Sequence, residues 1–325
     1  MKKFSIHLFI YSAICVTALL LFELYLLRVP NRYSFKYNYI DTHKNEIEIL
    51  LLGNCLIEDG LIPQILGPHT FNAAISGREK IYDAELAKQF IANMPKIKTV
   101  VLSVEYRDFA FGRGKVNPRD HKKHGGLKST IKCMHYKYMN IHVDPFWYWS
   151  EFLNSELNYK ERIHMTYQQQ IETDTLGFVK LLDANKIPEW EYWDLPGIYD
   201  TSLPIDSEMY KSLYQSYYTI AQICSEHQVR LILTSLPVYK TFQQDMNPHV
   251  EKEIKEFTAR IQREFPEVEY YNFFRDDRFH PEDFHDALHL SESGSRKFSH
   301  IISEIIGAPP FSVHTDTNPE LTALH

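Results

Sequence analysis

Short apolar runs separated by helical patterns occupy two stretches of the chain, from about residue 46 to 106 and from about 207 to 306. In the first stretch, the runs Ile47–Leu52, Thr70–Ile75 and Thr99–Val104 lie close to glycine or proline, which predicts three buried strands. Apolar residues between Arg78 and Met94 recur at helical spacing up to Pro95. This alternation of strand and helix is typical of a parallel sheet covered by helices.

The second stretch continues the same alternation. Strands are predicted over Val229–Thr234 and Val268–Phe273, and helices over Ser207–Gln228, Pro248–Phe265 and Leu290–Ile306. The sequence therefore predicts an α/β fold with five strands in a doubly wound, flavodoxin-like parallel sheet.

The N-terminal region, residues 1–30, has a different pattern. Phe4–Leu27 is almost wholly apolar and is long enough to cross a hydrocarbon core of about 30 Å as a helix. Lys2 and Lys3 favour a cytoplasmic N-terminus, which would place the rest of the chain outside the cytoplasmic membrane. A cleaved signal peptide is the alternative, but the apolar segment is long and no small-residue cleavage site follows it.

The alternation is interrupted between about residues 107 and 205. This segment mixes basic loop sequence with aromatic residues, and it contains all four tryptophans: Trp147, Trp149, Trp190 and Trp193. We interpret it as an insertion or cap over the sheet edge, within a domain that covers residues 31–309. The tryptophans either form the small core of this cap or offer an aromatic platform to sugar rings or lipid. The tail, 310–325, lacks a hydrophobic pattern and is predicted to be flexible.

Composition and charge exclude several classes of function. The formal net charge of -7 and the absence of a basic block argue against nucleic acid as a partner. The four cysteines are Cys15, Cys55, Cys133 and Cys224, and none has the spacing of a zinc ligand set. No metal or organic cofactor is therefore predicted. Cys133 and Cys224 are free to pair in an exported domain, which would leave Cys55 as a thiol.

Polar and reactive residues follow the predicted strands. Gly53-Asn54-Cys55 comes after the first strand, Ser76-Gly77 after the second and Glu105-Tyr106 after the third. Because the carboxyl ends of parallel strands share one edge, where ligands bind in such sheets, these residues are expected to lie together.

A base for the cysteine is found near the C-terminus, in Asp286-Ala287-Leu288-His289. Histidine can activate a thiol, and a carboxylate three residues earlier can orient the imidazole, with Asp283 as the nearest rival to Asp286. The backbone N–H groups of Cys55 and Gly77 are candidate donors to an oxyanion. The sequence thus predicts a Cys55, His289 and Asp286 triad.

These motifs resemble the SGNH, or GDSL-like, hydrolase superfamily. There a Gly-Asp-Ser or Gly-Asn-Ser turn carries the nucleophile, a glycine after the second strand supplies an oxyanion donor, and Asp-x-x-His supplies the base. Gly53-Asn54-Cys55, Ser76-Gly77 and the Asp286–His289 block match these positions over about 46–106 and 207–306. The resemblance implies that Asn54, Ser76 and Gly77 belong to the oxyanion or substrate-binding site.

The chain departs from this pattern in two places. A cysteine stands at the usual serine position, and the block after the third strand contains no Gly-x-Asn-Asp. The third oxyanion donor is therefore missing or replaced, with Tyr106 or Arg107 as candidates. Glu105 is interpreted as a salt-bridged part of the scaffold.

Within the superfamily, the N-terminal anchor is most similar to membrane-anchored proteins of envelope acylation, such as the teichoic-acid D-alanine transfer protein. This resemblance implies acyl transfer or ester hydrolysis on a cell-envelope polysaccharide or teichoic-acid-like acceptor, with a multi-span membrane acyltransferase as a possible partner. The competing class of function is a non-catalytic envelope assembly or glycan-binding protein on the same fold.

Overall fold

The computed structural model describes residues 2–110, 130–143, 163–165, 173–181, 190–192, 205 and 207–307. Within these residues, five strands form one parallel sheet in the order β2-β1-β3-β4-β5. The strands are β1 (Ile49–Leu52), β2 (Thr70–Asn72), β3 (Thr99–Ser103), β4 (Arg230–Ser235) and β5 (Glu269–Asn272). The predicted α/β class and the doubly wound parallel sheet are confirmed.

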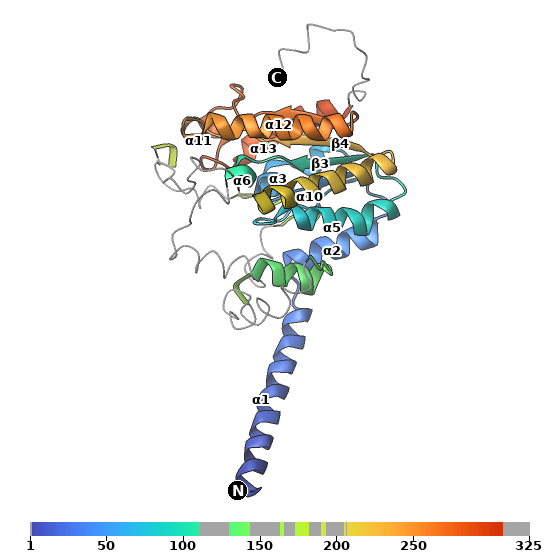
Figure 1. The fold of residues 1–325 in the computed structure, drawn as a ribbon, viewed down its shortest axis with the longest axis vertical. Coiled ribbons are helices and arrows are strands. Elements are labelled where there is room, and N and C mark those ends of the chain that lie inside the picture. Colours follow the sequence, from blue (N-terminus) through green and yellow to red (C-terminus); the bar gives the residue numbers. More distant parts are fainter. Residues whose placement is uncertain are drawn as a thin grey trace.

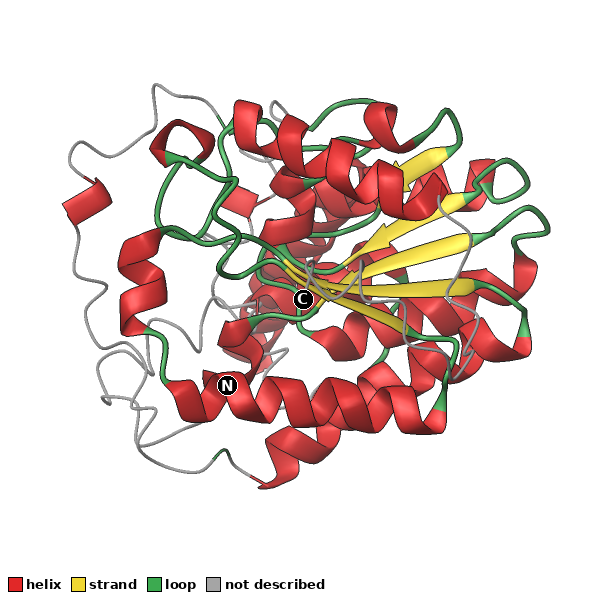
Figure 2. Ribbon diagram, turned by 90° about the horizontal axis from the view of Figure 1, so that it is seen from above, coloured by secondary structure: helices red, strands yellow, loops and turns green. Residues whose placement is uncertain are grey.

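Helices cover both faces of the sheet (Figure 2). Leu50, Val101 and Ile232, in the three central strands, have no exposed surface, as expected where helices bury both faces. The last helix, α13 (Glu292–Gly307), packs against α3 (Cys55–Gly60) and α4 (Pro63–Leu66). The other long helices also pack on one another, since α10 (Ser207–Glu226) contacts α5 (Lys80–Phe90) and α12 (Pro248–Glu264).

Shorter elements join these layers: α6 (Tyr106–Ala110), α11 (Lys240–Asp245) and the 3₁₀ turns η1 (Ile91–Asn93), η3 (Trp190–Tyr192) and η4 (Pro281–Asp283).

The second strand is shorter than the sequence predicts, because it ends at Asn72 rather than at Ile75. The Asn72 side chain bonds to the backbone on both sides of this end. Its Oδ1 accepts from the Ala74 amide at 3.1 Å, and its Nδ2 donates to the Ile57 carbonyl at 2.9 Å. An asparagine that bonds the backbone two residues ahead competes with the sheet ladder. The amides of Ala73 and Ile75 still donate to the Leu51 and Gly53 carbonyls, at 2.9 and 3.1 Å, so the segment continues beside β1 up to the turn at Ser76 and Gly77.

Helix α2 (Arg32–His43) was not predicted from the sequence. Asn31 caps it, accepting hydrogen bonds from the amides of Tyr33 and Ser34. The helix buries Tyr33 and Ile40 but also Lys36, so its apolar positions do not form the clean stripe by which amphipathic helices are recognised.

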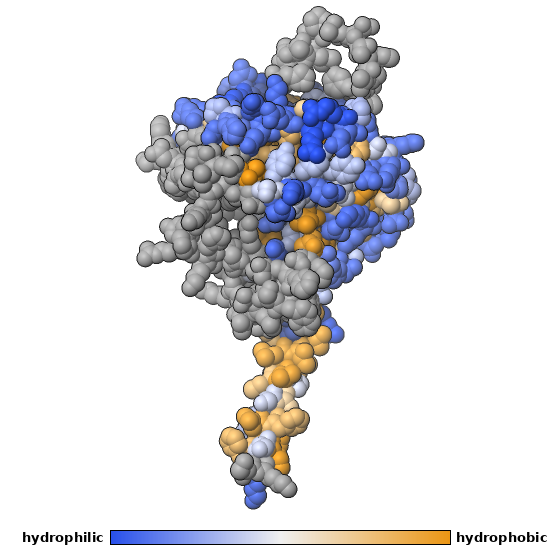
Figure 3. Space-filling model, in the orientation of Figure 1, coloured by the Kyte–Doolittle hydropathy of each residue, from blue (hydrophilic) through white to orange (hydrophobic). Residues whose placement is uncertain are grey.

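The N-terminal helix α1 (Lys2–Arg28) projects away from the rest of the molecule (Figure 1). An 18-residue window within its segment Lys3–Arg28 has a mean hydropathy of 2.1, and none of that window is buried. Figure 3 shows that the surface of α1 is mostly apolar. Every exposed large hydrophobic side chain among the described residues belongs to this helix. By length and composition α1 can cross a membrane, as either an anchor or a signal sequence.

The C-terminal end of α1 contacts a second helix, over residues 130–139. Glu23 forms an ion pair of 2.8 Å with Lys137, and the Tyr138 hydroxyl donates to the Leu26 carbonyl at 2.9 Å. Leu26 itself is fully buried. The end of the apolar helix is therefore joined to the domain.

The predicted insertion at 107–205 is described only in parts. One described part, 173–181, covers the free edge of the sheet, because the Leu176 carbonyl accepts from the Asn72 amide of β2 at 2.9 Å. Trp190 is buried, and its ring packs against Tyr239 and Phe284 of the main domain. The other tryptophans and the tail 310–325 lie outside the described residues, and the domain bounds stay predictions.

None of the four cysteines forms a disulfide, so the pairing of Cys133 with Cys224 is not formed.

The backbone conformation of Gly53, directly after β1, can be tested by substitution. Its φ is +135°, and a Cβ atom would lie 2.6 Å from the Ser103 Oγ. We expect Gly53→Ala to lower the free energy of unfolding by about 1–3 kcal/mol, because alanine would have to occupy a strained backbone conformation. Thermal unfolding followed by circular dichroism would measure the change. Gly307→Ala is the matched control, since a Cβ there meets nothing within 4 Å; equal effects of the two substitutions would contradict the strain.

Candidate active site

The candidate nucleophile lies at the start of a short helix. Strand β1 ends at Leu52, Gly53 turns the chain, and Cys55 is the first residue of α3. Asn54 caps this helix by accepting the Leu56 amide at 3.1 Å. With the strand order β2-β1-β3, the carboxyl end of β1 is the position where chain direction switches, which is where ligands bind in doubly wound sheets.

The structure brings Cys55, His289 and Asp286 into one chain of contacts. The Nε2 atom of His289 lies 3.2 Å from the Cys55 Sγ. On the other side of the ring, Nδ1 lies 2.8 Å from the Asp286 Oδ2 and 3.0 Å from its Oδ1. The order of sulfur, imidazole and carboxylate is the geometry of an activated nucleophile.

Local backbone bonds hold Asp286 in this orientation. Its Oδ1 accepts the amides of Leu288 and His289, each at 2.8 Å, so the Asp-x-x-His spacing closes a tight turn. The His289 carbonyl in turn accepts the His285 amide at 2.8 Å. These bonds within the loop align the carboxylate with the ring.

Electrostatics favour an ionised Asp286 and a protonated His289. Burial raises the pKa of Asp286, but the hydrogen bonds from the His289 ring and from backbone amides lower it to about 2. Burial likewise lowers the pKa of His289, but the charges of Cys55 and Asp59 and the bond to Asp286 raise it well above its usual range. A protonated imidazole beside the sulfur is the arrangement that stabilises a thiolate.

Asp283, the alternative partner from the sequence, is engaged elsewhere. Its carboxylate pairs with Lys297 and accepts the Ser293 hydroxyl at 2.9 Å. Asp286 is therefore the carboxylate that contacts His289.

Two backbone amides have the freedom that an oxyanion site requires. The N–H groups of Cys55 and Gly77 make no hydrogen bond to any described residue. The turn at Gly77 has a φ of +77°, and the residue is exposed. The adjacent Ser76 differs, because its amide donates to the Glu58 carboxylate at 2.8 Å. Within this turn, Gly77 rather than Ser76 carries the available backbone donor.

The side chains of Asn54 and Tyr106 are occupied by structural contacts. Asn54 uses its oxygen as the helix cap, and its Nδ2 donates to Glu105. Tyr106 is buried, and its hydroxyl accepts the Asn247 amide at 2.7 Å. The predicted scaffold role of Glu105 is confirmed by its buried ion pair with Lys80, at 3.2 Å. Both side chains therefore make structural contacts in this arrangement.

Two acidic residues of α3 were missed by sequence reasoning. Glu58 and Asp59 are buried, at 2% and 5% exposure. Asp59 stands one helical turn after Cys55, and its Oδ1 has no hydrogen-bond partner. Burial raises the pKa of Asp59 to about 7, although nearby His289 lowers it. The sequence did contain a signal for Asp59. It lies four residues after Cys55, a spacing that places the Asp59 and Cys55 side chains on one face of α3.

Within the described ranges, no group of three or more histidine, cysteine, aspartate or glutamate residues is arranged to hold a metal ion.

Comparisons with known proteins give little further information. No family model and no curated protein matches the chain. A solved structure with the provisional description of a platelet activating factor from Streptococcus pneumonia is 14% identical, with a TM-score of 0.43. The match covers 90% of this chain and 99% of that one. Similarity of this degree assigns no function, and the site is interpreted from its own geometry.

The contact between Asp286 and His289 predicts a change in thiol reactivity. In Asp286→Asn, His289 loses a charged partner and its pKa falls, so the imidazolium that supports the thiolate is less populated. We expect alkylation of Cys55 by iodoacetamide at neutral pH to slow, by up to about tenfold for a fall of one unit in the His289 pKa. Peptide mass spectrometry would measure the rate at Cys55. Asp283→Asn is the control from the same loop, and an equally slow control would contradict the assignment of Asp286.

The buried Asp59 carboxyl predicts a pH-dependent stability. Its pKa of about 7 lies above its value in the unfolded chain. The folded protein therefore binds more protons between about pH 4 and pH 7, and this group makes folding less favourable as the pH rises through that window. We expect Asp59→Asn to gain thermal stability relative to the wild type as the pH increases from 5 to 8. A difference in melting temperature that stays constant over this range would contradict the raised pKa.

Proposed function

We propose that this protein is a membrane-anchored, extracytoplasmic acyltransferase or esterase that acts on a cell-envelope glycan through Cys55, His289 and Asp286. The observation that carries the proposal is the contact of 3.2 Å between the Cys55 sulfur and His289, whose ring is oriented by Asp286. Structural cysteines are typically buried and inert. Cys55 instead is partly exposed at the ligand-binding edge of a parallel sheet and has a base in contact.

The reaction would proceed in two steps. The Cys55 thiolate attacks the carbonyl carbon of an acyl ester, a carbon–sulfur bond forms, and the leaving group departs with the proton of the His289 imidazolium. His289, now neutral, then removes a proton from an acceptor hydroxyl, which attacks the thioester and releases the thiolate. Asp286 keeps the Nδ1–H of the ring directed toward itself throughout, so that Nε2 faces the reacting atoms.

The free amides of Cys55 and Gly77 would stabilise the negative oxygen that forms in each step. Removal of one such donor in other enzymes costs about 3–4 kcal/mol. A thioester retains more transfer potential than an oxygen ester, which favours delivery to a glycan hydroxyl over hydrolysis. Cysteine at the usual serine position thus supports acyl transfer as the reaction.

The location follows from α1. Its apolar length, with Lys2 and Lys3 at its start, supports a single-pass anchor in the cytoplasmic membrane, with a cytoplasmic N-terminus and an extracytoplasmic domain. The motif resemblance to envelope acylation proteins supports a polysaccharide or teichoic-acid-like acceptor, and a multi-span membrane acyltransferase as the source of the acyl group.

The proposed nucleophile is tested by two substitutions at Cys55. With p-nitrophenyl acetate as acyl donor, the full chain in detergent should release p-nitrophenolate in a burst and gain one acetyl group on Cys55. Intact-mass and peptide mass spectrometry would detect the acetyl group. Cys55→Ala should abolish both signals, whereas retained activity in Cys55→Ser would indicate serine-type chemistry of the superfamily.

A wild-type chain that is never acylated would exclude the enzyme. The fold would then serve as a non-catalytic envelope assembly or glycan-binding protein.

A further inference from the structure

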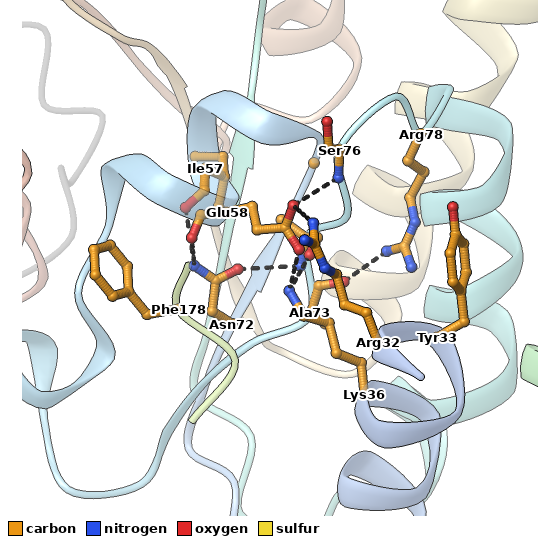
Figure 4. A network of polar contacts seen from close by, with 12 residues as sticks. Arg32, Tyr33, Lys36, Ile57, Glu58, Asn72, Ala73, Ser76, Arg78 and Phe178 are labelled. Atoms are coloured by element: carbon orange, nitrogen blue, oxygen red, sulfur yellow. Dashed lines mark hydrogen bonds and ion pairs between the residues drawn. The ribbon is translucent and has the colours of Figure 1, made fainter. Parts of the chain in front are cut away.

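A buried carboxylate connects three elements beneath the candidate site. Glu58 lies three residues after Cys55 on α3 and is 2% exposed. One of its oxygens accepts Arg32 Nη1 and the Ser76 amide, and the other accepts Lys36 Nζ, each at 2.8 Å (Figure 4). Burial raises the pKa of Glu58, but the charges of Lys36 and Arg32 lower it below its usual value. Glu58 is therefore a charged group held by donors on two other segments.

Both cations come from α2, the first helix after the apolar α1. Lys36 is fully buried, and its ammonium group also donates to the Ala74 carbonyl. Ala74 and Ser76 belong to the same segment after β2. Helix α2 thus contacts this segment in two ways, directly through Lys36 and indirectly through Glu58.

The position of Glu58 matters because the two free amides lie on different elements. The Cys55 amide begins α3, whereas the Gly77 amide lies in the turn after β2. Glu58 belongs to α3, and it accepts the amide of Ser76, the residue directly before Gly77. It therefore fixes the turn relative to the helix. A displacement of about 1 Å between groups that must act together can cost about a hundredfold in rate.

We propose that Glu58, held by Arg32 and Lys36, is a positioning residue that sets the Gly77 amide relative to Cys55 for oxyanion stabilisation. The helix that follows the apolar anchor is thereby part of the acyl site. This inference rests on the proposed function, because it concerns the oxyanion of an acyl-transfer step.

Two reactions of the same sulfur separate positioning from general stability. Alkylation by iodoacetamide forms a sulfur–carbon bond and expels iodide from a saturated carbon, so no oxyanion develops. Acylation by p-nitrophenyl acetate forms the thioester through a tetrahedral oxyanion and expels p-nitrophenolate. A variant that misplaces an oxyanion donor should slow only the second reaction, whereas a variant that disturbs the thiolate or the fold should slow both.

The test compares Glu58→Gln and Lys36→Met with the wild type, using the full chain in detergent micelles. We expect acylation of Cys55 to fall by about a hundredfold while its alkylation rate and pH profile stay close to wild type. The double variant Glu58→Gln with Lys36→Met should recover part of the acylation rate. Glutamine can still accept the Ser76 amide and Arg32, and without Lys36 its NH2 group no longer faces an ammonium group. Equal loss in both reactions, or an unchanged ratio of the two rates, would overturn the proposal.

The matched control is Glu269→Gln. Glu269 is 5% exposed and pairs with Arg230 at 2.5 Å, but it lies at the amino end of β5, opposite the edge that carries the site. Loss of this pair should lower the melting temperature and leave the ratio of acylation to alkylation unchanged. Where Glu58→Gln fails to fold, Lys36→Met makes the same comparison with the Glu58 to Arg32 pair retained.

Failure of the proposed function gives a different result. A wild-type chain that is alkylated but never acylated on Cys55 would reject acyl chemistry. The effect of Glu58 and its cations on the turn is then measured by hydrogen exchange of the peptide that contains Ser76 and Gly77. Exchange should be faster in Lys36→Met than in Glu269→Gln, and equal exchange would show that the network does not hold the turn.

Discussion

The contact between the His289 ring and the Cys55 sulfur joins residues 234 positions apart in the chain. It depends on the sheet, because strand order places the turn after β1 and the loop after β5 at one edge. It also depends on short-range bonds, since Gly53 turns the chain into α3 and the backbone amides of the 286–289 loop fix Asp286. The candidate site is therefore formed by two locally stable turns that only the complete fold brings together.

Three buried carboxylates, each in an ion pair, contact the turns after β1 and β2. Glu58 accepts the Ser76 amide and pairs with two cations of α2. Asp83 pairs with Arg78 and accepts the Gly53 amide, at 3.2 and 3.3 Å. Lys80 pairs with Glu105, which accepts the Asn54 side chain. Because removing charges from water costs several kcal/mol per ion, such pairs are poor sources of stability. Their contacts with the turns after β1 and β2 explain their placement as geometric support.

The apolar helix and the candidate site are separated by a single helix. The end of α1 is joined to residues 130–139 through Glu23 and Tyr138, and α2 begins immediately beyond, at Arg32. From there the side chains of α2 extend to the segment after β2. Helix α2 therefore links the end of the apolar helix to the segment that carries Gly77.

The sequence by itself determined the five strands, the apolar helix and the Cys55, His289 and Asp286 set, because apolar runs, glycine turns and the Asp-x-x-His spacing are local signals. It did not reveal α2, whose buried face mixes aromatic residues with Arg32 and Lys36. Only the tertiary structure decided that Gly77 rather than Ser76 has a free amide, and that Tyr106 is bonded to Asn247. The reason is physical: Glu58 lies 22 residues from Lys36, and Asn54 lies 51 from Glu105. The partner of a buried charge is set by which segments lie side by side in the folded chain. Such long-range contacts leave no periodic pattern in the sequence.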